Sequence, residues 1–132
     1  MENTQKSPET GSDSEVLFPD REITIGDETI AVREFSYGEQ LRYAARCRGL
    51  LAAIEQAFAA DEAASVDDVI EDFSDEWLSL LALATGKPRD WLVALTREQG
   101  DLLSTAMWGA NRDFFLRTIA RRRVLRERMQ SA

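Results

Sequence analysis

The stretch Glu22-Ile-Thr-Ile-Gly-Asp-Glu-Thr-Ile-Ala-Val32 has the alternating apolar and polar pattern of two β-strands joined by a tight turn. The turn falls at Gly26-Asp27, a pair that tolerates the positive φ angles of a two-residue hairpin loop. From Ser36 onward the apolar residues change to helical spacing and keep it almost to the end of the chain. Because an isolated hairpin is only marginally stable in water, we expect this one to pack on the helices or on another chain.

Capping residues divide the chain after the hairpin into helices. Ser36 is followed three residues later by Glu39, a capping box that predicts a helix ending near Ala60. Further helical patterns cover three more segments, residues 65–85, 87–95 and 96–128. Two alternatives stay open within them: a restart or kink at 74–76, and a break at Asn111 in place of a continuous helix. We therefore expect a mainly α fold, a small helical domain of about four helices with an N-terminal β-hairpin.

Composition separates the two ends of the chain from this domain. We predict four segments: a disordered acidic leader at 1–14, a β-hairpin segment at 15–35, a helical domain at 36–120 and a basic C-terminal helix extension at 121–132. The leader contains one apolar residue, too few to offset the entropy of ordering. The extension has a narrow apolar stripe flanked by arginine, which is marginal as an isolated helix. We expect it to dock on a partner, such as a second copy of the chain.

The residue types exclude most catalytic and metal sites. The 132 residues include no histidine and one cysteine, which removes the commonest general base and any Cys/His zinc site. We predict no catalytic residue, no cofactor and no metal ligand, and we interpret Cys47 as a small buried side chain. The apolar run 77–84 is too short to cross a bilayer, and the polar first 15 residues do not resemble a signal peptide. We expect a cytoplasmic protein that is not an enzyme.

Charge is distributed unevenly around a net value of −8. Residues 61–76 contain eight acids and no base, whereas residues 112–128 contain seven arginines and two acids. Acids in the first turn of a helix are favoured by the helix dipole, so a solvated face with good caps explains most of the acidic run. The basic end is where an anionic partner would bind.

Large aromatic residues and arginines supply the candidate partner-binding positions. The aromatic residues are interpreted first as core, because their spacing turns most of them inward. The alternative is that Trp108 or Phe115 forms part of a groove for a helix of another protein. A groove and a core have the same periodicity, so both interpretations stay open. The candidate contacts are Trp108, Phe114, Phe115, Arg117, Arg121, Arg122 and Arg123.

Several phrases of the sequence resemble one family of phage proteins. The hairpin ends in Val32-Arg33-Glu34-Phe35, and a later segment reads Thr85-Gly86-Lys87-Pro88-Arg89-Asp90-Trp91-Leu92. A Leu-rich helix then closes on Met107-Trp108-Gly109-Ala110-Asn111-Arg112-Asp113-Phe114-Phe115. With the preceding hairpin, these phrases resemble the tail assembly chaperones of long-tailed, Mu-like phages of pseudomonads, over about residues 15–120.

The resemblance implies a non-enzymatic role in virion assembly. Such chaperones bind the long, helical tape measure protein, keep it soluble and help to recruit tail tube subunits. They act in the host cytoplasm and are typically absent from the mature virion. The resemblance carries no catalytic residue to this chain.

Two other functions are compatible with the charge pattern. The run 61–76 could imitate the phosphates of a nucleic acid, which would suit a small phage inhibitor of a host protein. Residues 121–128 could instead bind DNA or RNA in a regulator, with an affinity that falls steeply with salt. The pI of about 4.6 and the lack of a helix-turn-helix signal argue against nucleic acid as the partner.

Overall fold

The computed structural model describes residues 21–59 and 65–131. The predicted leader at 1–14 and the start of the hairpin segment, residues 15–20, lie outside the described residues. Two strands come first, and seven helices follow in the described part of the chain: β2 (Arg21–Ile25), β3 (Glu28–Val32), α2 (Tyr37–Arg46), α3 (Arg48–Ala59), α4 (Ser65–Asp72), α5 (Ser74–Thr85), α6 (Arg89–Val93), α7 (Arg97–Ala110) and α8 (Arg112–Ser131).

The prediction of a mainly α fold with an N-terminal hairpin is confirmed, but the number of about four helices is wrong. Three of the expected helical stretches are broken at single residues, Cys47, Phe73 and Asn111, whose φ angles lie between −103° and −117°. The helix predicted from Ser36 to about Ala60 is therefore two helices, α2 and α3. The capping box at its start is present: the Ser36 and Glu39 side chains each accept a hydrogen bond from the other residue's backbone N–H.

The hairpin packs on the helices of its own chain. β2 and β3 pair antiparallel with Ile23 opposite Ile30, and Gly26 adopts the left-handed conformation that the two-residue turn requires, with φ of 61°. Ile30 and Val32 are buried against α5 and α7. The end of β3 is fixed to α5 by a hydrogen bond of 3.0 Å from the Arg33 N–H to the Ala84 carbonyl.

Asn111, between α7 and α8, joins the hairpin to the helical body. Its side chain is 1% exposed. The Oδ1 atom accepts a hydrogen bond of 2.7 Å from the Phe35 N–H, and Nδ2 donates bonds of 3.2 Å to the carbonyls of Arg33 and Met107. One amide thus satisfies buried backbone groups from two distant parts of the chain.

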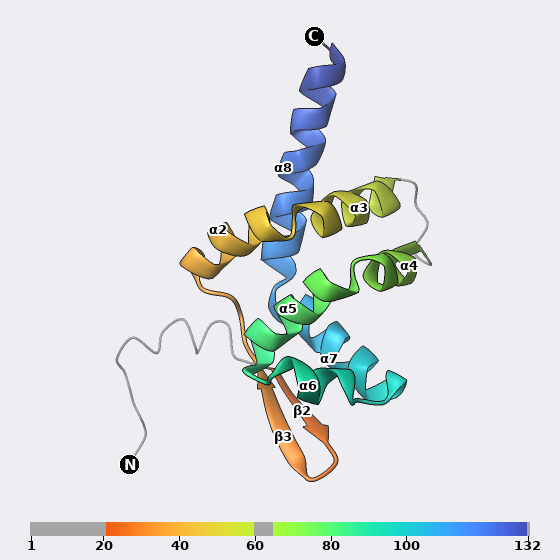
Figure 1. Ribbon diagram of the computed structural model, residues 1–132. Coiled ribbons are helices and arrows are strands. Elements are labelled where there is room, and N and C mark those ends of the chain that lie inside the picture. Colours follow the sequence, from red (N-terminus) through yellow and green to blue (C-terminus); the bar gives the residue numbers. More distant parts are fainter. Residues whose placement is uncertain (1–20, 60–64, 132) are drawn as a thin grey trace, which may run out of the picture.

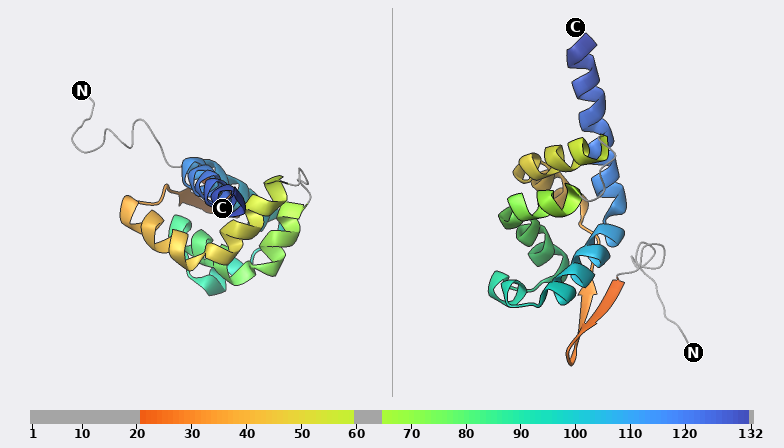
Figure 2. Two further views of the ribbon diagram at one scale, coloured as in Figure 1. Left: turned by 90° about the horizontal axis from the view of Figure 1, so that it is seen from above. Right: turned by 90° about the vertical axis from the view of Figure 1, so that its right-hand side faces the viewer.

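Helix α8 begins inside the body and extends beyond it. It packs across α3, and its C-terminal part projects past that helix into solvent (Figures 1 and 2). The buried Glu55 carboxylate of α3 accepts a hydrogen bond of 2.9 Å from Arg126 Nη1. This ion pair fixes α8 to α3 at Arg126.

Cys47 occupies the break between α2 and α3 and is 2% exposed. Burial, followed by the nearby Glu76 carboxylate, raises the pKa of the Cys47 thiol to about 11. The thiol stays protonated at neutral pH, so the interpretation of Cys47 as a small buried side chain is confirmed.

Glu39 provides a pH-dependent contribution to stability. The Arg33 guanidinium donates two hydrogen bonds of 2.8 Å to the Glu39 carboxylate. These bonds, reinforced by the Ser36 N–H and opposed by partial burial, lower the pKa of Glu39 from 4.5 to about 2. A lowered pKa stabilises the fold above pH 4.5, and this contribution is lost as the pH falls toward 2.

We expect Glu39→Gln to lower the free energy of unfolding at pH 7 by about 1 kcal/mol, a value that allows for solvent screening of this ion pair. The glutamine keeps the capping acceptor but loses the charge. Urea unfolding of both proteins between pH 7 and pH 2 should show the difference shrinking as the pH falls below 4.5. A difference that stays constant over this range would contradict the assignment.

Candidate protein-binding groove

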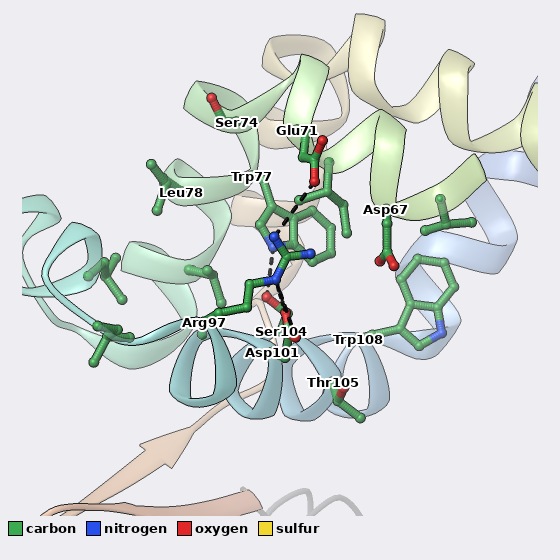
Figure 3. A pocket seen from close by; sticks show the side chains of 16 residues that line it. Asp67, Glu71, Ser74, Trp77, Leu78, Arg97, Asp101, Ser104, Thr105 and Trp108 are labelled. Atoms are coloured by element: carbon green, nitrogen blue, oxygen red, sulfur yellow. Dashed lines mark hydrogen bonds and ion pairs between the residues drawn. The ribbon is translucent and has the colours of Figure 1, made fainter. Parts of the chain in front are cut away.

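An apolar groove lies between helices α4, α5, α6 and α7 (Figure 3). Its volume is about 610 Å³. Its lining comes from all four helices and from the turn before α7: Val66, Asp67, Ile70, Glu71, Ser74, Trp77, Leu78, Leu81, Leu92, Leu95, Arg97, Gly100, Asp101, Ser104, Thr105 and Trp108. Half of these 16 residues are apolar, so the groove presents to solvent an apolar surface that is not packed into the core.

The inner wall of the groove is rigid. Trp77 is 5% exposed, and its indole Nε1–H donates a hydrogen bond of 2.9 Å to Ser104 Oγ. This bond connects α5 to α7 across the base of the groove. Leu81 and Leu92 are buried beside it, whereas Ile70 and Leu78 are only half-buried. A partner would therefore meet a fixed apolar surface with little rearrangement.

The rim of the groove is acidic. It carries three carboxylates, Asp67, Glu71 and Asp101, against one guanidinium, Arg97. Arg97 crosses the opening from α7: its Nη1 lies 3.6 Å from Glu71 of α4, and its Nε lies 3.3 Å from Asp101 (Figure 3). Asp101 first, and then Glu71 and Asp67, raise the pKa of Arg97. The excess of negative charge favours a partner with basic residues beside its apolar ones.

Other acids of the run 61–76 have structural roles. Asp75 pairs with Arg89, and Glu76 Oε1 accepts a hydrogen bond of 3.0 Å from the Leu50 N–H at the start of α3. Asp67 lies in the first turn of α4, as the capping interpretation predicts. Among residues 21–59 and 65–131, no group of three or more His, Cys, Asp or Glu is placed to hold a metal ion.

The structure separates the three aromatic candidates. Trp108 is half-buried and lines one end of the groove. Its ring stacks on that of Phe115 at a centroid distance of 4.5 Å, and Phe58 contacts it edge-on at 5.9 Å. Phe114 and Phe115 are 4% and 0% exposed and belong to the core. Trp108 alone of the three can touch a partner directly, and Phe115 supports it from beneath.

The arginine candidates lie apart from the groove. Arg117, Arg121 and Arg123 are exposed along α8, and Arg122 is half-buried with its Nε buried and without a hydrogen-bond partner among the described residues. None of the four is among the residues that line the groove, and α8 runs away from α6 and α7 (Figure 1).

Sequence reasoning missed most of the groove, in particular Ile70, Leu78, Leu95, Arg97 and Gly100. One signal was present in α5. Trp77, Leu80 and Leu81 form its core stripe, and the adjacent Leu78 widens the apolar face beyond that stripe. A helix apolar over so wide an arc has a second partner to cover it.

Residues 13–132 match the model of a family described as a family of unknown function (DUF6631). The chain belongs to this family. No match was found among curated proteins, and none among solved structures. In the part of the chain that the structure describes, none of the helices is long and apolar enough to span a membrane.

Proposed function

We propose that this protein is a non-enzymatic binding protein whose groove holds the apolar face of an amphipathic helix. The observation that carries the proposal is the open apolar groove between α4 and α7, with Trp77 and Trp108 in its wall. Helix-in-groove recognition places the apolar residues of one helical face in such a groove. The acidic rim adds a preference for lysine or arginine beside that face.

We further propose that the helix belongs to a phage tape measure protein, and that the chain is a tail assembly chaperone. The resemblance to Mu-like chaperones described above supports this assignment. A long helical tape measure offers many amphipathic segments, which matches the chemistry of the groove. In this role the protein acts in the host cytoplasm, brings tail tube subunits to the tape measure and does not enter the mature virion.

Co-expression with the tape measure protein of the same phage tests the proposal. Size-exclusion chromatography with light scattering should show a complex, and its mass gives the number of chaperone copies per tape measure. If the two proteins are soluble and folded but elute separately at micromolar concentration, the proposal is wrong.

A pair of glycine variants tests whether the groove is the binding surface. Gly100 lines the groove and Gly38 lies on α2, and a Cβ at either position would meet no atom within 4 Å. Glutamine is a better helix former than glycine, so neither change should destabilise the fold. We expect Gly100→Gln to raise the Kd for a tape measure segment at least about tenfold, because the new side chain fills the groove. Gly38→Gln should leave that Kd unchanged.

Isothermal titration calorimetry of the two variants and the unchanged protein measures this difference. Equal affinity of Gly100→Gln and Gly38→Gln would move the binding site elsewhere on the molecule.

A further inference from the structure

The C-terminal part of α8, residues 121–131, is here named the arm. Its apolar residues lack cover: Val124 is 46% exposed, Leu125 48% and Met129 80%. Arginines stand among them, with Arg121, Arg123 and Arg128 also exposed. The arm is thus a basic helix of about 16 Å with three exposed apolar side chains, held to its own chain through the ion pair of Arg126 with Glu55.

The groove is complementary to the arm in charge and in polarity. Its walls are apolar, and its rim has three carboxylates to one guanidinium. The exposed Asp68 and Asp72 extend the negative charge along α4. α4 and α7, which both line the groove, are about 12 Å and 21 Å long, and the length of the arm falls between the two.

The arm cannot reach the groove of its own chain. It projects beyond α3 on the side of the body away from α6 and α7, in both views of the molecule from the side (Figures 1 and 2). Since α8 is one continuous helix from Arg112 to Ser131, and Arg126 fixes it to Glu55, the arm keeps this direction.

We propose that the arm of one copy docks in the groove of a second copy, with Leu125 and Met129 on its apolar walls and arginines against its acidic rim. Two arms would not pair with each other, because each presents the same positive charge. The contact therefore joins two different surfaces, and the copies assemble head to tail into a ring or an open chain. This inference uses the same groove as the proposed function, but it does not depend on the tape measure protein.

The test uses two variants of the full chain. Leu125→Glu/Met129→Glu disables the arm at two exposed positions and leaves the groove intact. Gly100→Gln fills the groove and leaves the arm intact.

Sedimentation velocity at about 100 μM protein detects any contact with a Kd below about 10 μM. We expect the unchanged protein to form species larger than one chain that dissociate in 0.5–1 M salt, at which the charges are screened within roughly 3–5 Å. Each variant alone should be monomeric.

An equal mixture of the two variants decides the geometry. The intact arm of one fits the intact groove of the other, and no further copy can be added, so the mixture should contain dimers and nothing larger. An unchanged protein that stays monomeric overturns the inference, as does self-association of either variant. A mixture that remains monomeric overturns it as well. The arm variant also separates the two proposals, because it should still bind the tape measure segment that Gly100→Gln has lost.

Discussion

Replacing Phe115 with alanine is expected to lower the free energy of unfolding by about 3–5 kcal/mol. The side chain is fully buried, and three aromatic rings surround it: Trp108 at 4.5 Å, Phe114 at 5.2 Å and Trp77 at 6.2 Å between centroids. Alanine would leave a cavity among rigid rings that cannot collapse to fill it, which places the cost at the upper end for such substitutions.

Urea unfolding followed by circular dichroism measures this loss, and Phe58→Ala is the matched control. Phe58 touches the same Trp108 ring but is 38% exposed, so its replacement should cost about 1 kcal/mol or less. If Phe115→Ala costs no more than Phe58→Ala, Phe115 is not a core residue and returns to the candidate contacts for a partner.

Phe115 also explains why core and groove could not be distinguished from the sequence. Trp108 stacks on Phe115, and the two rings are separate layers of one aromatic cluster. One faces the groove and the other the core, yet both fall on the apolar stripes of neighbouring helices. Periodicity identifies an apolar face. What covers that face is decided by helices far away in the sequence, here α4 and α5.

The features that were predictable depend on a few adjacent residues. The hairpin turn needs positive φ at Gly26, and Gly86 ends α5 in the left-handed conformation with φ of 72°. Thr96 and Gln99 form the capping box that begins α7, as Ser36 and Glu39 do for α2. Each signal is local, so tertiary packing did not alter it.

The three helix breaks gave weaker signals: the sequence left open a restart or kink at 74–76 and a break at Asn111, and nothing indicated the break at Cys47. Cys47, Phe73 and Asn111 each leave helical φ and ψ, but the backbone hydrogen bonds continue through them. For example, the Cys47 N–H donates to the Tyr43 carbonyl, and the Cys47 carbonyl accepts from the Leu51 N–H. A change of direction at one residue leaves the apolar spacing intact on both sides. Periodicity alone therefore does not decide between a continuous helix and a break, and the count of about four helices was too low.

At the third break, Asn111→Ala is expected to lower the free energy of unfolding by about 3 kcal/mol. The change removes the acceptor of the Phe35 N–H and the donor to the Arg33 carbonyl. The buried Phe35 N–H would then lose this acceptor, and an unsatisfied buried group costs more than a hydrogen bond contributes. The loss should concentrate at the hairpin, since Asn111 joins it to the junction of α7 and α8.

Urea unfolding measures the size of this loss, and hydrogen exchange at single amides shows where in the chain it is concentrated. Protection in residues 21–35 should fall more than protection in α5. Ser104→Ala provides the comparison: it removes one hydrogen bond, from Trp77 Nε1–H, at the groove, where water can replace the hydroxyl, and should cost about 1 kcal/mol. An equal cost for the two variants would mean that the Asn111 amide does not hold the hairpin. The hairpin would then be fixed by its buried apolar side chains and by the hydrogen bond from the Arg33 N–H to the Ala84 carbonyl, and the break at Asn111 would serve only to turn α8 across α3.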